Sequence, residues 1–415
     1  MTTHVIVDCD PGVDDAMALL LLFGAMRMKR QSRDEEQFEI IGITICHGNL
    51  GRKEGVSQLA KNACRVLHLI EQCSNTEALK KQTRIPVVMG SCSLLCGEEH
   101  DGATFVHGDD GLGGRTSWID FDENDEQNSL DAYSRIVPDV TASDWIIETV
   151  KQTENVVLIT LGPLTNIALA LRKDPSITER IRGVYTMGGA LNTHGNISEV
   201  SEANIYNDPL AANELFTSGL SIYLAPLNLT RQLTFNGESF IHDLVSANPL
   251  IGSFILHVSK FYLDFNLASL GTDITNIHDS TAVALFVCPG IFSNWKDIWI
   301  RVEAESKLTR GMTVCDMRGG IQNVSEYECN VHVPASVDAV AFNRYYHRAI
   351  SALSPLKQEF PIAPLRRRFV LCLGGSFNPI HQNHIDIMVS AKRRLEEEFG
   401  PGCVLAGYMA VSVDP

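Results

Sequence analysis

Residues 5–22 read VIVDCDPGVDDAMALLLL, an apolar strand followed by a Pro-Gly turn and an apolar helix. The run HVIVD predicts the strand, and the helix is predicted from Asp14 to about Met28. Four carboxylates lie within eight consecutive residues at this junction: Asp8, Asp10, Asp14 and Asp15. In open α/β sheets, ligands bind at the carboxyl ends of the strands. The stretch therefore predicts a strand-to-helix unit of an α/β protein with an acidic site at the sheet edge.

Similar apolar runs alternate with helical patterns along most of the chain. Strands are predicted in FEIIGITIC, PVVMG, NVVLITLG, GVYTMGG and SIYLAPLN, and a helix at about 52–70. These runs are continuously apolar, as expected for strands covered on both faces. Further strands are predicted in IWIRVEA, MTVCDMR and YECNVHVPA, followed by a helix to about Ile350. The predicted fold class is α/β, with a mainly parallel central sheet flanked by helices.

A proline-containing segment, SPLKQEFPIAPLRRR, separates two predicted domains. We place the main domain at 1–351, the linker at 352–366 and a second domain at 367–415. The length of 415 residues also favours two units, because single cores rarely grow beyond roughly 250–300 residues. The acidic run IDFDENDEQNSLD, within 113–140, predicts an exposed loop.

Composition narrows the class of partner. Lys and Arg number 34 against 50 Asp and Glu, a net charge of −16, which argues against nucleic acid or a membrane surface and favours a small molecule. The apolar run AMALLLLFGAM is about half the ~20 residues that a membrane-spanning helix needs, and no basic segment precedes it. Eleven cysteines without C-x-x-C spacing are expected to be reduced and buried, so the expected compartment is cytoplasmic.

The four clustered carboxylates can remain ionised together only if a cation neutralises them. Hard oxygen ligands favour Ca²⁺ or Mg²⁺. A helix N-terminus alone would stabilise Asp14 and Asp15 by ~0.3–1 kcal/mol and would leave Asp8 and Asp10 without a partner. A phosphatase of the haloacid dehalogenase type also opens with D-x-D, but normally has a small or hydroxyl residue two positions later and no D-D pair. The stretch therefore predicts a divalent metal site.

The motif DCDPGVDDA resembles the N-terminal fingerprint of the inosine-uridine-preferring nucleoside hydrolase family. Matching blocks follow in order: HGN, HGDDGLGG, LGPLTNIALALR, MGGALNTHGN, EANIYNDPLAA and HDSTAVA. The resemblance spans about residues 4–350. It implies the nucleoside hydrolase fold, one Ca²⁺, a homodimer or homotetramer, and hydrolysis of the N-glycosidic bond of inosine- or uridine-type ribonucleosides to ribose and free base in nucleoside catabolism.

The resemblance also implies the metal and catalytic residues. The metal ligands would be Asp10, Asp15, Asp279 and the backbone carbonyl of Leu161. The catalytic residues would be Asp14 as general base, His278 as acid for the leaving base, and Asn49. These residue types suit ribosyl hydrolysis, because a carboxylate can accept a proton from a metal-activated water and surrounding anions stabilise an oxocarbenium-like ring. A histidine can donate a proton near neutral pH.

A second set of matching positions would bind the substrate: Asp8 in the shell around metal and ribose, His107 near the base, and Asn196, Glu202 and Asn204 at the ribose hydroxyls. Taken alone, Asn49 and Asn196 could equally be turn residues, since each follows a glycine. Two positions depart from the family pattern: Ala203 replaces a usual Phe, and Ser280 a usual Pro. The first change would loosen the ribose pocket or alter its specificity.

The second domain opens with LCLGGSFNPIHQNHIDIMVSAKRRL, which resembles nicotinamide mononucleotide adenylyltransferase of the nucleotidylyltransferase superfamily. The implied nucleotide-binding residues are Gly375, Ser376, Phe377, His381 and His384, at a helix N-terminus suited to phosphate. Asn383 stands where the family has Gly. About fifty residues are too few for a domain of ~150 residues, so we expect a partial Rossmann-like unit, inactive by itself.

Two alternatives to a nucleoside hydrolase stay open. The assayable function could be nucleotidyl transfer by the C-terminal unit, or the protein could bind nucleosides without turnover. The sequence does not identify the preferred base, because specificity pockets are built partly from loops.

Overall fold

The computed structural model describes residues 2–32, 36–73, 82–97, 102–114, 133–271, 274–316, 329–354, 369–375, 389–394 and 404–411. Its chain divides into two compact units, Met1–Pro355 and Leu356–Pro415. No helix in these ranges is long and apolar enough to cross a membrane.

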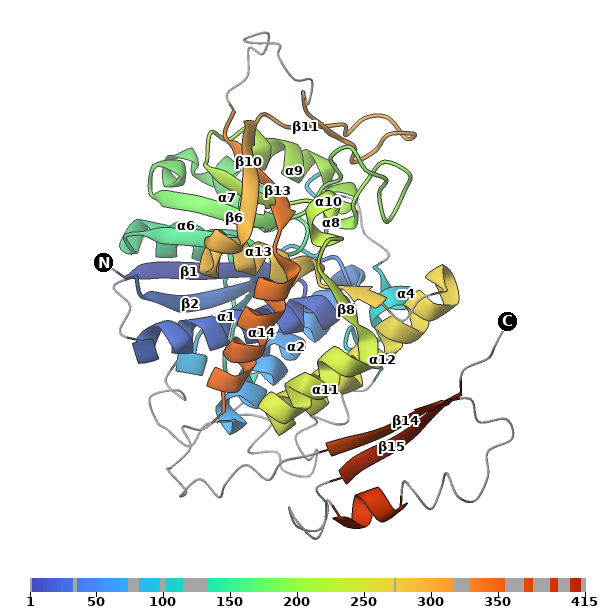
Figure 1. Cartoon of the computed structure of the whole chain (residues 1–415). Coiled ribbons are helices and arrows are strands. Elements are labelled where there is room, and N and C mark those ends of the chain that lie inside the picture. The colour runs from blue at the N-terminus through green and yellow to red at the C-terminus, as the bar shows by residue number, and fades with distance from the viewer. Residues whose placement is uncertain are drawn as a thin grey trace. The chain divides into compact units, whose positions relative to one another are not determined.

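A nine-stranded sheet runs through the first unit (Figure 1). Its spatial order is β10 (Phe292–Ile298), β13 (Val331–Val337), β7 (Ile222–Ala225), β6 (Ile181–Met187), β5 (Val156–Thr160), β1 (Thr3–Cys9), β2 (Phe38–Ile45), β3 (Val87–Met89) and β4 (Ile136–Val137). Every neighbouring pair is parallel except β10 with β13. The predicted class, a mainly parallel sheet flanked by helices, is confirmed.

Helices cover both faces of the sheet, and each face has its own apolar core. One core includes side chains of α1 (Val13–Ser32), α2 (Arg52–Gln72), α12 (Pro249–Leu270), α13 (His278–Val287) and α14 (Ala339–Ala352). The other includes α6 (Ala142–Gln152), α7 (Thr165–Lys173) and α9 (Pro209–Phe216). Along β1, Val5 and Val7 belong to the first core and Ile6 to the second. This two-sided burial explains why the strands are continuously apolar.

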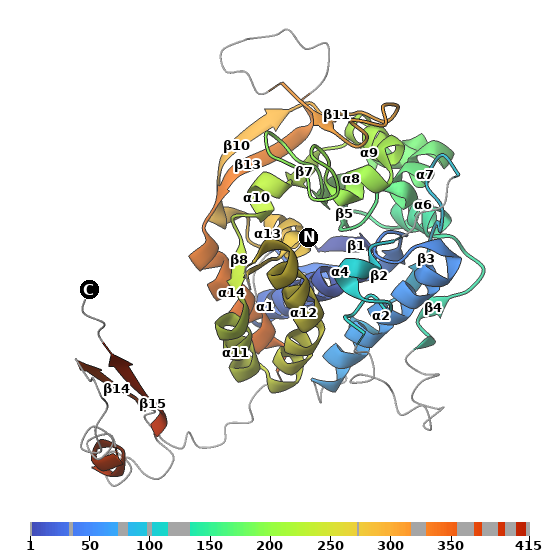
Figure 2. The same cartoon turned by 90° about the vertical axis from the view of Figure 1, so that its right-hand side faces the viewer.

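Strand order places a crevice beside β1. The chain proceeds from β1 outward through β2, β3 and β4, then returns to the other side of β1 and continues outward through β5, β6 and β7. The connections that leave the carboxyl ends of β1 and β5 therefore diverge. In such sheets this switch point is where ligands bind. Figure 2 shows β1, β5 and the surrounding α4, α12 and α13 from this side.

Two elements differ from the sequence prediction. Helix α1 continues to Ser32 rather than ending near Met28, and its last turn carries Lys29 and Arg30, which favour a helix C-terminus. Strand β10 was not predicted, because the five residues between its ends are exposed and polar or aromatic rather than alternating. It lies at the edge of the sheet, where only one neighbour is needed.

The second unit contains two parallel strands, β14 (Phe369–Gly375) and β15 (Val404–Val411), with a helical segment at 389–394 between them in the sequence. Gly375 is the last residue of β14. The other predicted nucleotide-binding residues, Ser376, Phe377, His381 and His384, lie outside the described residues, as does Asn383. The acidic run IDFDENDEQNSLD also lies outside them. The adenylyltransferase-like assignment and the exact domain limits stay predictions.

Candidate active site

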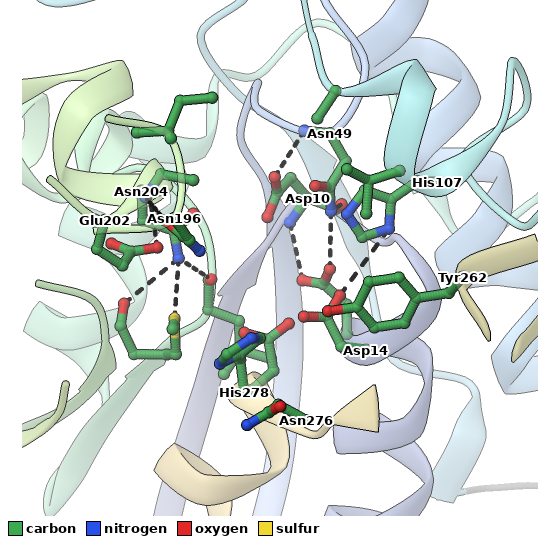
Figure 3. A pocket seen from close by; sticks show the side chains of 18 of the residues that line it. Asp10, Asp14, Asn49, His107, Asn196, Glu202, Asn204, Tyr262, Asn276 and His278 are labelled. Carbon is green, nitrogen blue, oxygen red and sulfur yellow. Dashed lines mark hydrogen bonds and ion pairs between the residues drawn. The ribbon is translucent and has the colours of Figure 1, made fainter. Parts of the chain in front are cut away.

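A cavity of about 480 Å³ opens at the carboxyl edge of the sheet. This size lies within the ~300–1,000 Å³ typical of small-molecule sites. Figure 3 shows two groups of side chains facing each other across it, with His278 and Asn276 between them. Its lining includes every predicted site residue of the first unit except Asp8: Asp10, Asp14, Asp15, Asn49, His107, Leu161, Asn196, Glu202, Asn204, His278 and Asp279.

Three carboxylates converge in this cavity. Asp14 and Asp15 lie in the first turn of α1 and Asp279 in the first turn of α13, and one oxygen from each lies within 4.8 Å of the others. Asp10, at the end of β1, lines the same cavity. Burial, and then repulsion by neighbouring carboxylates, raises the pKa of Asp15 to about 7 and also raises the pKa of Asp279 well above its ordinary value. Ionised together, these groups fit a divalent cation.

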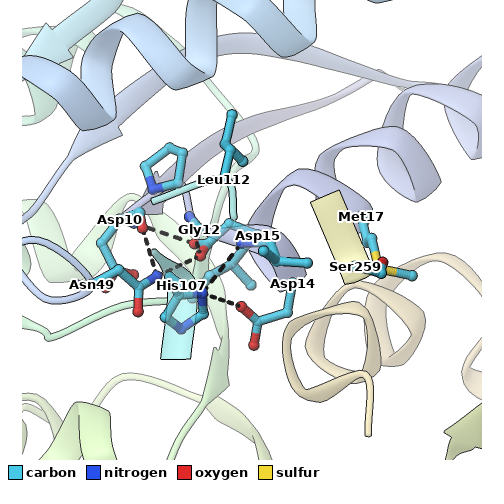
Figure 4. Close-up of polar contacts among 12 residues, drawn as sticks. Asp10, Gly12, Asp14, Asp15, Met17, Asn49, His107, Leu112 and Ser259 are labelled. Atoms are coloured by element: carbon cyan, nitrogen blue, oxygen red, sulfur yellow. Dashed lines mark hydrogen bonds and ion pairs between the residues drawn. The ribbon is translucent and has the colours of Figure 1, made fainter. Parts of the chain in front are cut away.

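Hydrogen bonds hold two of these carboxylates in place (Figure 4). Asp15 accepts from the backbone amides of Asp10 at 3.2 Å and Gly12 at 3.0 Å. The Asn49 side-chain amide donates to the Asp10 carbonyl at 2.7 Å and to the Asp15 carboxylate at 3.1 Å, and its backbone amide donates to the Asp10 carboxylate at 2.8 Å. Both side-chain protons of Asn49 are used, so only its Oδ1 remains for a ligand.

Glycines make this close approach possible. A Cβ at Gly48 or at Gly162 would collide with the Asp10 carboxylate. A Cβ at Gly12 would lie 2.5 Å from the Asn49 side-chain nitrogen and 2.7 Å from Nδ1 of His107. The HGN, LGP and DPG motifs therefore supply room for the carboxylates as well as turns.

Amide and carboxylate groups on the opposite wall are equally fixed. Glu202 caps α8 (Ala203–Asn207), accepting from the backbone amides of Gly189, Asn204 and Ile205 at 3.0, 2.9 and 3.2 Å. The Asn204 side-chain nitrogen donates to the Leu161 carbonyl at 2.6 Å. A carbonyl has two lone pairs, so this bond leaves one for a cation.

The two asparagines of this wall offer different groups to a ligand. The Ala203 backbone amide donates to Oδ1 of Asn196 at 2.9 Å, which leaves the Asn196 nitrogen as donor. Asn204 uses its nitrogen on Leu161 and keeps its oxygen as acceptor. A sugar hydroxyl can both donate and accept, so the pair is suited to a polyhydroxyl ligand.

Two of the three histidines that line the cavity, His107 and His278, are uncharged at neutral pH. His107, the last residue of α4 (Thr104–His107), accepts from the Val13 amide at 3.4 Å, and burial lowers its pKa. Nδ1 of His278 lies 2.8 Å from the Thr230 hydroxyl, and burial lowers its pKa to about 4. A protonated His278 at neutral pH, the simplest form of the expected acid, is therefore disfavoured in the ligand-free cavity.

Asp8 lies apart from the cavity lining. One carboxylate oxygen accepts from the Thr44 hydroxyl at 2.5 Å and from the Asn166 side-chain amide at 2.8 Å. The other has no partner among the described residues. Burial raises the pKa of Asp8 to about 7. The structure thus places Asp8 behind the site, where it connects β1, β2 and α7.

Sequence reasoning missed several residues of the cavity. Arg231, Tyr262 and Asn276 line it, and the Tyr262 ring stacks on His107 with centroids 6.1 Å apart. None of them stands in a motif that the sequence singled out. A strand followed by the helix start LTN could have drawn attention to Asn166, the partner of Asp8.

Fold and cavity together define a class: an α/β protein whose acidic site at the switch point of the sheet faces amide groups suited to a polyhydroxyl ligand. The comparisons specify the family. Residues 5–344 match the model described as Inosine-uridine preferring nucleoside hydrolase. The chain therefore belongs to this family, whose members are glycosidases that hydrolyse N-glycosyl bonds of nucleosides, and it is an enzyme of that type.

Relatives and solved structures agree with this assignment. The chain is 32% identical over 314 residues to probable uridine nucleosidase 2 of Oryza sativa subsp. japonica, a match covering 75% of this chain and 82% of the relative. Uridine nucleosidase 1 of Arabidopsis thaliana is 31% identical, with 75% and 81% covered. A purine-preferring ribonucleoside hydrolase from Gardnerella vaginalis superposes with a TM-score of 0.69 at 28% identity, covering 85% of this chain and 99% of that one.

Proposed function

We propose that the cavity hydrolyses inosine- and uridine-type ribonucleosides to ribose and free base, with Ca²⁺ as its metal. The observation that carries the proposal is the meeting of the Asp14, Asp15 and Asp279 carboxylates opposite the amide wall of Asn196 and Asn204. A ribose needs hydroxyl partners on one side and, as its bond to the base breaks, negative charge near the ring.

The residues that would hold the cation are Asp10, Asp15, Asp279 and the Leu161 carbonyl. All are oxygen donors, which Ca²⁺ prefers. When bound, the cation would lower the pKa of a coordinated water. Burial raises the pKa values of Asp10 and Asp279. The positive charge of the cation would oppose this effect and keep both carboxylates ionised.

Asp14 is the residue we assign to take the proton from the attacking water. It lines the cavity but is not among the carboxylates fixed by backbone amides, as Asp15 is. Nδ1 of His107 lies 4.0 Å from an Asp14 oxygen, but the His107 ring is uncharged at neutral pH and does not neutralise the carboxylate. Its carboxylate is therefore available to a water at the sugar.

Asn49, Asn196, Glu202 and Asn204 would orient the ribose. Glu202 already accepts three backbone amides, so its chief role is to hold α8 and Asn204 in place. His278 would assist the leaving base. Its pKa of about 4 leaves the ring neutral near pH 7. In the tautomer whose Nδ1 accepts from the Thr230 hydroxyl, Nε2–H would donate a hydrogen bond as negative charge develops on the base.

The test is ribose release from inosine, uridine and cytidine, measured with and without a chelator. We expect release that the chelator abolishes and that Ca²⁺ restores. Binding of nucleoside without release would favour the non-catalytic alternative. ATP-dependent dinucleotide formation, lost on changing His381, would favour the C-terminal alternative. Light scattering and cell fractionation test the predicted homodimer or homotetramer and the predicted cytoplasmic location.

A further inference from the structure

Arg231 is the cation of the cavity lining that the chemistry above does not use. It directly follows α10 (Leu227–Thr230) and lines the cavity. Burial lowers its pKa, and no carboxylate opposes that effect. In the described part of the chain it forms no ion pair, so its guanidinium is held by neutral groups alone. Ion pairing therefore does not explain why an arginine lies in the lining of this acidic cavity.

Its hydrogen bonds show what the guanidinium holds. Nη1 donates to the Thr193 hydroxyl at 3.0 Å and to the His194 carbonyl at 2.7 Å, and Nη2 donates to the Gly195 carbonyl at 2.8 Å. The planar guanidinium thus binds three consecutive residues, Thr193–Gly195. The residue that follows them is Asn196, whose side-chain nitrogen is the donor left for a ligand.

The backbone hydrogen bonds within this loop do not do the same as the bonds from Arg231. Gly195 and Asn196 donate their amides to the carbonyls of Glu199 and Ser201, at 3.0 and 3.1 Å. These bonds close the loop on itself and define its internal shape. The bonds from Arg231 instead join the loop to α10, on the other side of a segment of more than thirty residues.

We propose that Arg231 is a positioning residue. Its guanidinium fixes the backbone at Thr193–Gly195 and thereby holds the Asn196 side-chain amide where it can donate to a ribose hydroxyl. The inference rests on the proposed function, since it requires that Asn196 binds the sugar. Lysine cannot substitute, because a single ammonium lacks the planar fork that reaches three acceptors at once.

A double-mutant cycle tests this. Arg231→Met keeps the aliphatic stem but removes the fork. We expect it to raise KM for inosine or uridine by about 10-fold with a smaller change in kcat, a loss typical of one charged hydrogen-bonding group. Arg231→Lys should fold and show a similar loss. In the Asn196→Ala background, Arg231→Met should cost less than 3-fold, because the residue through which it acts is gone.

The matched control is Arg180→Met. Arg180 also donates to a backbone carbonyl, that of Lys151 at 3.0 Å, but it is exposed and is not part of the cavity lining. It should leave KM unchanged. Full additivity of the Arg231 and Asn196 losses, or unaltered KM in a folded Arg231→Lys variant, would overturn the proposal.

The same cycle separates this inference from the proposed function. If the wild-type protein releases no ribose from any nucleoside, the proposed function fails, and the cycle is repeated with calorimetric binding of ribose as the readout. Coupling between Arg231 and Asn196 in ribose binding would then support the positioning role. Independent effects would reject it whether or not the protein turns over a nucleoside.

Discussion

Asp14 is the residue on which the proposed chemistry depends most directly. We expect Asp14→Asn to lower kcat by about 10²–10⁴-fold, the usual contribution of a general base, with little change in KM. The exposed Asp243 of α11 (Gly237–Ala247) provides the control, because Asp243→Asn makes the same chemical change away from the cavity. A folded Asp14→Asn enzyme that keeps wild-type kcat in ribose release would remove Asp14 from the mechanism.

We expect the contribution of His278 to kcat to be larger for substrates with a poorer leaving group. His278→Ala should lower kcat for inosine and uridine by about 10²-fold, because their bases depart with developing negative charge. A nitrophenyl riboside, whose leaving group is stable as an anion, should be cleaved at nearly the wild-type rate. Thr230→Val, which removes the hydroxyl 2.8 Å from Nδ1 of His278, should give an intermediate loss. Equal losses on both substrates would contradict the role.

At the residue scale, the sequence was informative where chemistry is concentrated in one motif. The acidic residues of DCDPGVDD predicted a metal site, and the structure brings Asp14 and Asp15 together with Asp279 in a cluster that could hold a cation. Arg231 gave no comparable signal, since a single arginine after an apolar run is common on surfaces. Its place in the cavity depends on the tertiary contact between α10 and the loop before Asn196. Asp8 also required the fold, because its partners lie on β2 and α7.

Helix α1 shows how an element depends on close packing. Gly24 faces α14, and a Cβ there would collide with the backbone carbonyl of Ala349. We expect Gly24→Ala to destabilise the protein by about 1–3 kcal/mol, because two buried helices must move apart. Urea unfolding measures it, with the exposed Gly290→Ala as control, since a Cβ there meets nothing within 4 Å. Equal midpoints for the two variants would show that α1 and α14 separate freely.

At the element scale, the sequence predicts a strand well when both of its faces are buried. Strands covered on both faces, such as β1 and β5, have continuous apolar runs that the sequence displays. In the run IWIRVEA, Ile298 ends β10, and Arg301–Val302 form the two-residue strand β11, paired with β12 (Thr313–Val314). Polar edge strands such as β10 derive their conformation from the neighbouring strand, so no local pattern marks them.

For the whole molecule, we expect buried thiols to lower the free energy of unfolding at alkaline pH. Burial raises the pKa of Cys64 from 9.0 to about 12. The folded state therefore keeps its proton where the unfolded state loses it, and this contribution is complete below pH 9 and is lost as pH rises toward 12. Urea unfolding at pH 8.5 and 10.5 should show a fall that is smaller in Cys64→Ala. Cys96→Ala, at an exposed position, is the control. An unchanged fall in Cys64→Ala would exclude this thiol as the cause.

The proposed cation ligands come from opposite ends of the first unit, Asp10 and Asp15 from its beginning and Asp279 from α13 near its end. During synthesis the early carboxylates leave the ribosome long before α13 exists. The proposed site would therefore be complete only after the sheet has assembled and α13 has docked against it. A cation bound by these carboxylates would favour the folded unit over the unfolded chain, in which they are not held together.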